Sequence, residues 1–541
     1  MYSLRPGSEL AQLRDEIFDL AASKYAMQLP QIRFFVLESL EFAALLEKQV
    51  YPASPVNIWE GKRMLHKKHQ ISTGLESALY YEVVQTGNPS YAYLNDGNSA
   101  MTQASVMAHV CGHCEFSEIN VLGDSDTDRT EYVMYLVAKT ELARRQMGES
   151  NYINYWNACE SIIPFIAPNA QFNLANSIEQ ETSFRPSDSS AQPEEDSPPK
   201  AIPFYSESLQ TLLRPAREDQ YHSVERELQR QEVLSRKGYR LHAPCQDIAG
   251  FLRSYAPASN TEHSVLDYLY VCHQHQDFVM RTQIMNEGWA MYWEKLMMLD
   301  LFAGDHVKGV IDYARVFSGV CSPRPFYARN PYHLGYHLWC HIKQQLDAGR
   351  LTLEYLEETD RETKDNWDLR NGKDSHTQMR QLVATITDYE FLRRYLSLEL
   401  IQEYHLNRIP KRDTPFLNLQ DSDIETADER YIWIEAAVAR DQMLNFFVHY
   451  NRPRIYVIDN EFLDGGLLLY HRDDGRPLRQ SWLKPTLHNF YAIWKAPVYL
   501  ISRQWLYGYG AEGYKESNVQ KLSFEMICER MQRQKKPFRL Q

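Results

Sequence analysis

The longest helical pattern in the chain constrains the fold most. It spans residues 263–302, HSVLDYLYVCHQHQDFVMRTQIMNEGWAMYWEKLMMLDLF, and contains no proline and a single glycine. Its apolar residues recur three and four positions apart, as on the buried face of a helix. Weaker patterns of the same kind occur at 10–26, 37–51, 74–85, 100–119, 130–148, 151–166, 223–237, 309–317, 333–346 and 353–366. A loop rich in Asn, Gly and Ser is expected at 88–99. The sequence therefore predicts a mainly α protein.

Two changes of composition divide the chain. Residues 176–202, NSIEQETSFRPSDSSAQPEEDSPPKAI, are rich in Ser, Pro and acidic side chains, which predicts a disordered linker. After residue 404, β-rich runs at 455–458, 467–471 and 498–502 predict strands, with room for a helix between the last two. We therefore expect a helical part at 1–175, the linker at 176–202, a second helical part at 203–404 and a small α+β domain at 405–541.

Charge and cysteine content exclude several classes of protein. The net charge is −13, from 58 basic and 71 acidic residues, which argues against a broad nucleic-acid surface. The N-terminus lacks the pattern of a signal peptide, and no run approaches the roughly 18 apolar residues of a membrane span. The eight cysteines are scattered and form no small disulfide framework. We therefore expect a reduced, cytoplasmic protein that binds neither nucleic acid nor membranes.

The segment HVCGHCEF can be interpreted in two ways. Cys111 and Cys114 form the CGHC pattern of disulfide isomerases. A thioredoxin-type site, however, needs a preceding strand and a helix N-terminus at its first cysteine, and the residues before Cys111 have a helical pattern instead. His109 and His113 are four residues apart, so on a helix their imidazoles would project side by side and could bind one ion. Ordinary packed side chains are the plain alternative for both pairs.

Two later stretches add candidate ligands. MNEGWAMYWEKLM places Glu287 at the start of an aromatic-rich helical segment. Glu287 could be a third metal ligand, an acid/base group or a solvated carboxylate. RNPYHLGYHLWCHI places His333, His337 and His341 at intervals of four, either as a second metal-like stripe or as an exposed polar face.

In their order along the chain, these motifs resemble the SpoVR (stage V sporulation protein R) family. The resemblance rests on NPSYAYL at 88–94, MAHVCGH at 107–113, IMNEGWAMYW at 284–293 and NPYHLGYHL at 330–338. It extends to NIWEGKRM near the start and LLLYHRDDGRPL near the end, so it covers nearly the whole chain. Residues 116–120 read FSEIN where many relatives carry Phe-Phe-x-Asn-Asn, so the chain resembles a divergent member.

The resemblance implies a cytoplasmic bacterial protein, linked by name to sporulation, with a helical metallopeptidase-like body. Genes of the family often lie beside one for a serine protein kinase, which makes such a kinase system a candidate partner. The resemblance also implies that His109, His113 and Glu287 hold a divalent metal, with zinc as the expected ion.

If that ion is catalytic, we expect a hydrolase that cleaves an amide bond in a peptide or in cell-wall material. Val110 stands where a zincin carries its glutamate base, so the base must come from elsewhere; Glu115 is the first candidate and Glu294 the second. Tyr292 or Tyr336 would stabilise an oxyanion. The alternative is a non-enzymatic regulatory or scaffold protein, linked to sporulation or stress physiology, in which the same residues form a buried polar network.

Overall fold

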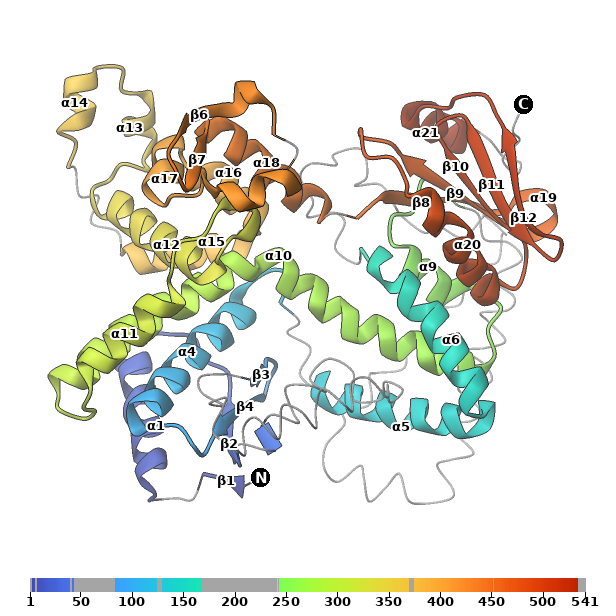
Figure 1. Ribbon diagram of the computed structural model, residues 1–541. Coiled ribbons are helices and arrows are strands. Elements are labelled where there is room, and N and C mark those ends of the chain that lie inside the picture. The colour runs from blue at the N-terminus through green and yellow to red at the C-terminus, as the bar shows by residue number, and fades with distance from the viewer. Residues whose placement is uncertain are drawn as a thin grey trace. The chain divides into compact units, whose positions relative to one another are not determined.

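The computed structural model describes residues 2–4, 7–38, 41–42, 83–123, 129–167, 241, 243–368, 374–417, 419–450 and 452–533. The chain divides into two compact units, each made of two separate stretches (Figure 1). Unit 1 comprises Met1–Thr130 and His275–Tyr450, and unit 2 comprises Glu131–Gln274 and Asn451–Gln541. The described residues are mainly helical, with a strand-rich C-terminal region, as the sequence predicts. The four-segment division stays a prediction, and its linker at 176–202 lies outside the described residues.

Unit 1 begins with a small sheet of strand order β1-β2-β4-β3, in which β2 and β4 run parallel. Its strands are β1 (Tyr2–Ser3), β2 (Ile32–Leu37), β3 (Val83–Gln85) and β4 (Ser90–Asn95). Two expectations are wrong here, because the loop predicted at 88–99 contains β4 and the described end of the helix predicted at 74–85 is β3. The residues of β4 alternate between buried and half-buried positions, as in a strand, and its pairing outweighs the local turn composition. The helical pattern at 223–237 lies outside the described residues.

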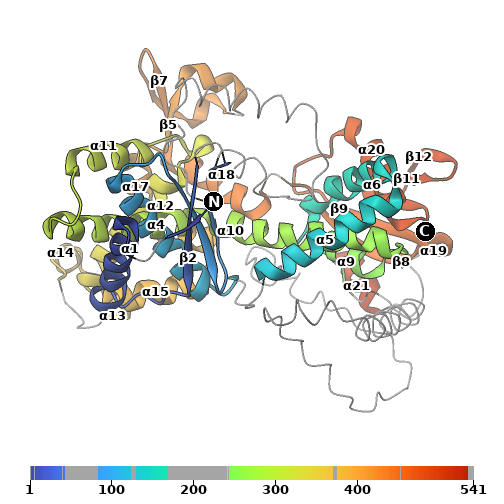
Figure 2. The ribbon, with the colours of Figure 1, turned by 90° about the horizontal axis from the view of Figure 1, so that it is seen from below.

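Most of the rest of unit 1 is helical, and α4 and α12 lie against the C-terminal part of α10 (Figures 1 and 2). They are α1 (Glu9–Asp19), continued by η1 (Leu20–Lys24), α4 (Ala100–Ile119), α10 (Asn260–Ala303, in unit 1 from His275), α11 (Val310–Val320), α12 (Pro331–Asp347), α13 (Leu353–Glu357), α14 (Arg361–Asp365), α15 (Ser375–Thr385), α16 (Asp388–Tyr395), α17 (Leu398–Glu403) and α18 (Ala436–His449). A second small sheet, of order β5-β7-β6, contains β5 (Arg408–Pro410), β6 (Ile424–Ala427) and β7 (Tyr431–Ile434).

Two of the helices that carry family-like motifs, α4 and α12, begin at capping side chains. Ser99 precedes α4, and its side chain accepts a hydrogen bond from the backbone N–H of Thr102. Asn330 caps α12 in the same way by accepting from the N–H of Tyr332. Pro331 follows at the first helical position, where its missing N–H costs nothing. The Asn-Pro-Tyr motif therefore fixes where α12 begins.

Three glycines allow the helices of unit 1 to cross closely. A Cβ on Gly112 of α4 would lie 2.5 Å from the Cα of Ala290 in α10. A Cβ on Gly288 of α10 would lie 2.2 Å from the carbonyl carbon of Gly335 in α12. No larger side chain fits at such distances, so these glycines set how near α4 and α12 come to α10.

Unit 2 contains α5 (Arg129–Met147), α6 (Glu149–Ile162), α9 (Ile248–Tyr255), the first part of α10, and a five-stranded sheet of order β12-β11-β10-β9-β8. The strands are β8 (Arg454–Glu461), β9 (Gly466–Arg472), β10 (Val498–Ser502), β11 (Trp505–Gly510) and β12 (Gly513–Asn518). The helices beside them are α19 (Phe462–Gly465), α20 (Gln480–Trp494) and α21 (Phe524–Arg533). The three predicted strands and the helix expected between the last two are thereby confirmed.

Strands β9 and β10 run parallel and are joined through α20. Helix α20 packs against β10 and β11, with the ring of Tyr491 5.6 Å from that of Tyr509. Phe524, at the start of α21, packs 4.8 Å from Tyr456 on β8. Among the described residues, no helix has the length and apolar content needed to cross a membrane.

Candidate metal centre

Two neighbouring helices bring the predicted ligands together. His109 and His113 lie one turn apart on α4 and are both buried. Glu287 extends from α10, and its Oε2 lies 3.7 Å from Nε2 of His109 and 3.4 Å from Nε2 of His113. One ligand atom from each of the three residues lies within 4.8 Å of the others. The three form a group that could hold a metal ion.

The separations match those of a metal's ligand shell. Zinc bonds to nitrogen and oxygen are about 2.0–2.2 Å long, and at tetrahedral angles such bonds separate two ligand atoms by about 3.4 Å. The two distances from Glu287 to the imidazoles are close to that value. Two imidazoles and a carboxylate also form the ligand set of several catalytic zinc sites, which keep a fourth position open.

The second nitrogen of each imidazole is held in place. Nδ1 of His109 lies 2.8 Å from a carboxylate oxygen of Glu294, and Nδ1 of His113 lies 2.9 Å from the side-chain oxygen of Asn286. Both oxygens accept hydrogen bonds, so in neutral rings each Nδ1 carries the proton. The lone pair is then on Nε2, the nitrogen that faces Glu287. Such outer partners orient the histidine ligands of many metal sites.

Glu294 is itself fixed by a second contact. The hydroxyl of Ser105, one turn before His109 on α4, donates to Oε1 of Glu294 at 2.5 Å. Glu294 is fully buried, whereas the side chain of Glu287 is 18% exposed. Ser105, Glu294 and His109 thus form a buried chain that ends at the cluster, and Glu287 has the most exposed side chain of the three candidate ligands.

The backbone of α10 is anchored just before Glu287. The carboxylate of Asp388 accepts from the N–H groups of Ile284 at 2.8 Å and Met285 at 2.9 Å. The indole of Trp339 donates to the carbonyl of Met285 at 3.0 Å. Burial raises the pKa of Asp388 to about 8, although the two N–H donors oppose this shift. These contacts fix the turn of helix that carries Asn286 and Glu287.

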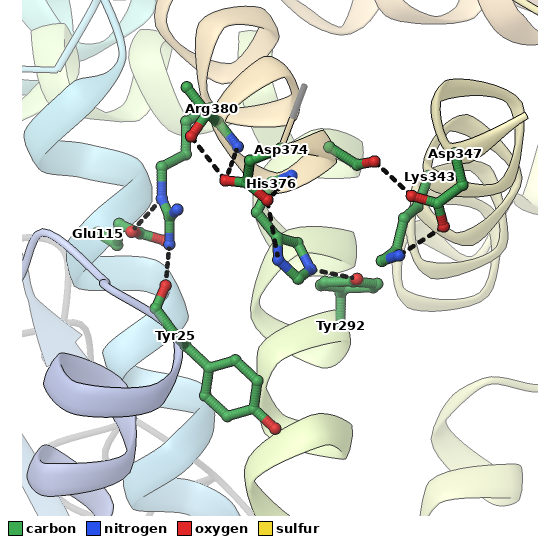
Figure 3. Close-up of polar contacts among 10 residues, drawn as sticks. Tyr25, Glu115, Tyr292, Lys343, Asp347, Asp374, His376 and Arg380 are labelled. Atoms are coloured by element: carbon green, nitrogen blue, oxygen red, sulfur yellow. Dashed lines mark hydrogen bonds and ion pairs between the residues drawn. The ribbon is translucent and has the colours of Figure 1, made fainter. Parts of the chain in front are cut away.

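The structure does not bring Glu115, the first candidate base, to the cluster. Its Oε1 accepts from Nε of Arg380 at 2.8 Å (Figure 3). The same oxygen accepts from the N–H of Gln28, and Oε2 accepts from the indole of Trp289. Two residues along a helix turn a side chain by about 200°, so Glu115 points away from His113. Glu115 therefore serves a buried ion pair.

The phenol groups of both predicted oxyanion donors are also engaged elsewhere. The hydroxyl of Tyr292 lies 2.8 Å from Nε2 of His376, beside the network of Glu115 (Figure 3). The hydroxyl of Tyr336 accepts from Nζ of Lys295 at 2.6 Å. Burial raises the pKa of both phenols, so they stay protonated at neutral pH. Glu294, the second candidate base, does reach the cluster, but as the partner of His109.

The cysteines of the segment do not support a redox site. Cys111 and Cys114 lie in the interior of α4, are fully buried and are free thiols. Burial raises the pKa of Cys111 well above its usual value and that of Cys114 to about 12. A reactive dithiol needs a lowered thiol pKa and access to solvent, so the CGHC pattern is incidental here.

The stripe of histidines on α12 does not form a comparable cluster among the described residues. The rings of His333 and His337 lie 4.6 Å apart and pack against Tyr404. Burial, followed by the neighbouring His337, lowers the pKa of His333 to about 4. These rings are therefore neutral packing elements at neutral pH.

Several residues around the cluster were not predicted from the sequence as parts of the site. Ser105 and Asn286 are partners of the site, and Tyr332 places its ring 6.1 Å from that of His109. Ser105 precedes His109 by four residues, and Glu294 follows Glu287 by seven, so helical spacing alone could have pointed to both.

Comparisons with known proteins agree with the family resemblance of the sequence motifs. The model of the family described as SpoVR like protein matches residues 7–444. An uncharacterized protein of Escherichia coli strain K12, YcgB, is 25% identical over 306 residues, which cover 54% of this chain and 55% of that protein. The chain thus matches about half the length of this curated relative. None of the solved structures matches the chain, so the metallopeptidase-like fold stays an expectation. With most of its length matched, the chain belongs to the SpoVR-like protein family.

Proposed function

We propose that the protein binds one divalent metal ion, with zinc the expected one, through His109, His113 and Glu287, and uses it to hydrolyse an amide bond. One observation carries this proposal: two imidazole nitrogens and a carboxylate oxygen converge while the opposite nitrogen of each ring is already held. A buried polar network without an ion would not require both rings to present Nε2 to the same oxygen.

The ligand set decides what chemistry is available. When bound, an ion such as zinc polarises a carbonyl group and lowers the pKa of water to about 7. Hydrolysis adds water across the C–N bond, so the acyl carbon gains a hydroxyl group and the amine gains a proton. The exposed side of Glu287 is where an extended substrate reaches the cluster.

The chain's own residues take supporting roles. Glu294 and Ser105 hold the ring of His109, and Asn286 holds that of His113. Tyr332 packs beside His109 and is a better-placed oxyanion donor than Tyr292 or Tyr336. A peptide or cell-wall substrate, a serine protein kinase partner and a cytoplasmic location remain predictions, because no contact in the structure bears on them.

Metal analysis of the purified full chain tests the binding step. We expect about one ion per chain after equilibration with zinc and dialysis, and less than a tenth of that in His109→Ala and Glu287→Gln. His337→Ala, which changes a histidine of the α12 stripe, is the matched control and should keep the ion. A wild-type chain without metal, or equal metal in all four proteins, would rule the proposal out.

The hydrolytic step needs its own measurement. Release of new amines from peptide and peptidoglycan substrates should depend on added zinc and fall at least tenfold in Glu287→Gln. Tyr332→Phe should lower kcat while leaving the metal content unchanged. Metal that binds normally but supports no amine release would reject the hydrolase and leave a metal-binding protein.

A further inference from the structure

A cavity of about 810 Å³ opens in unit 2, at the carboxyl ends of the parallel strands β9 and β10. Ligands of open α/β sheets bind outside the carboxyl ends of the strands, where a loop leads into the following helix. Here the loop 473–479 leads from β9 into α20, and Leu478 and Gln480 line the cavity. This region lies beyond residue 444, where the family match ends, and is separate from the metal cluster in unit 1.

Two buried polar side chains line this cavity. His471 is the second-last residue of β9 and Ser502 the last of β10; they pair directly in register and are 1% and 6% exposed. Nδ1 of His471 lies 2.9 Å from Oγ of Ser502. Within the described part of the chain, Nε2 of the same ring makes no hydrogen bond. Because His471 lines the cavity, this nitrogen is available to a ligand that enters it.

The acidic residues at the rim are already neutralised by arginines. Asp473 is paired with Arg503. Asp474 accepts from Nη1 of Arg454 at 2.9 Å and lies 3.4 Å from Nε of Arg472. The two carboxylates are thus paired with three guanidinium groups, of which those of Arg472 and Arg503 line the cavity.

Lys521 and the start of α20 also favour an anion. Lys521 lines the cavity and forms no salt bridge within the described ranges. Glu525 also lines the cavity and keeps its negative charge, because its own backbone N–H and Ser523 lower its pKa, so it offsets one of the cations. Helix α20 begins at the cavity with no side-chain cap and no acidic residue in its first turn. Uncapped N–H groups and the helix dipole attract negative charge there.

An aromatic wall completes the cavity. Trp505 is 37% exposed at the start of β11, and Phe524 and Tyr470 lie among the other lining residues. An exposed indole next to cations and a helix N-terminus suits a ligand that carries both a planar ring and a phosphate group.

We infer that this cavity binds a nucleoside phosphate, with its phosphates beside Lys521 and the N-terminus of α20 and its base against Trp505. The inference does not depend on the metal cluster or on hydrolysis. It assigns a second, independent site to the C-terminal region.

Calorimetric titration of the full chain with ADP, pyrophosphate and adenosine tests this site. We expect one saturable site for ADP, at least tenfold weaker binding of pyrophosphate, and at least tenfold weaker binding of adenosine. Lys521→Glu should weaken ADP binding at least tenfold. Lys484→Glu makes the same charge change about one turn into α20, at an exposed position outside the cavity lining, and should leave binding within twofold.

Trp505→Ala separates the base from the phosphates. We expect this variant to lose most of its affinity for ADP and to bind pyrophosphate as the wild type does. No saturable ADP binding, adenosine or pyrophosphate bound as tightly as ADP, or equal binding by Lys521→Glu and Lys484→Glu would each overturn the inference. All three substitutions lie on the surface, and unchanged circular dichroism spectra confirm that the variants are folded.

Discussion

At the level of single residues, the outer partners of the histidine pair on α4 determine which ring nitrogens can bind a metal ion. Glu287 and Glu294 are two helical turns apart on α10, so both face α4, one toward Nε2 and the other toward Nδ1 of His109. The sequence places these glutamates on one face but cannot say which one contacts which nitrogen. Val110, in the zincin base position, is buried in α4, so this cluster does not follow the zincin arrangement.

Glu294→Gln should weaken metal binding without abolishing it. The amide keeps an oxygen that can accept from Nδ1 of His109 but loses the negative charge that raises the basicity of the ring. Changes to such partners typically cost 10–100-fold in affinity. Competition with a zinc chelator of known affinity measures the change. Glu118→Gln, an exposed position on α4, is the control; equal affinities in both variants would show that Glu294 does not support the site.

The buried ring of His333 should make stability depend on pH. Its pKa is lowered to about 4 by burial, against about 6.5 in the unfolded chain, so the unfolded state binds more protons between these values. The stabilisation is therefore complete above pH 6.5 and is lost as the pH falls toward 4, by about 2–3 kcal/mol. Urea unfolding at pH 7 and 4.5 should show that the free energy of unfolding falls less in His333→Asn than in the wild type. His488→Asn, at an exposed position, should lose as much unfolding free energy as the wild type. If His333→Asn also loses as much as the wild type, the pH dependence does not come from His333.

At the level of elements, local patterns predicted some segments and failed for others. The limits of α4 agree with the expected helix at 100–119, because its periodicity and its capping serine are both local. Strand β4 was missed because it is stabilised by pairing with β2, a segment over fifty residues earlier. The exclusion of Glu115 from the cluster was predictable from helical rotation alone, whereas the engagement of Tyr336 by Lys295 needs the tertiary packing of α10 against α12.

The crossing of α10 and α12 supports a prediction of its own. Gly288→Ala should destabilise the protein by roughly 1–3 kcal/mol or more, because the new Cβ would meet the backbone of Gly335 at 2.2 Å and must push the helices apart. The same shift moves Glu287, so metal affinity should fall as well. Gly319→Ala, in α11, meets nothing within 4 Å and should instead stabilise by about 0.5–1 kcal/mol. Thermal unfolding and zinc titration of both variants measure the difference; similar behaviour would show that the crossing is not tight.

At the level of the whole molecule, each compact unit combines two distant stretches of chain. A reading along the sequence can find composition boundaries, but it cannot find which stretches pack together. The two candidate sites fall in different units: the cluster of His109, His113 and Glu287 lies in unit 1, and the cavity beside α20 lies in unit 2. Stabilisation by a ligand at either site should therefore appear first in its own unit.

Removal of metal tests this separation. Free metal at a hundred times its Kd stabilises the state that binds it by about 2.7 kcal/mol, and a chelator removes this stabilisation. On addition of EDTA, we expect faster amide hydrogen exchange in peptides from α4, α12 and 275–303 of α10. Peptides from β8 to β12 should exchange as before, and the affinity for ADP should be unchanged. His109→Ala should exchange like the EDTA-treated wild type and show no further response to the chelator. A response spread evenly over both units, or one that persists in His109→Ala, would show that the stabilising ion is bound elsewhere.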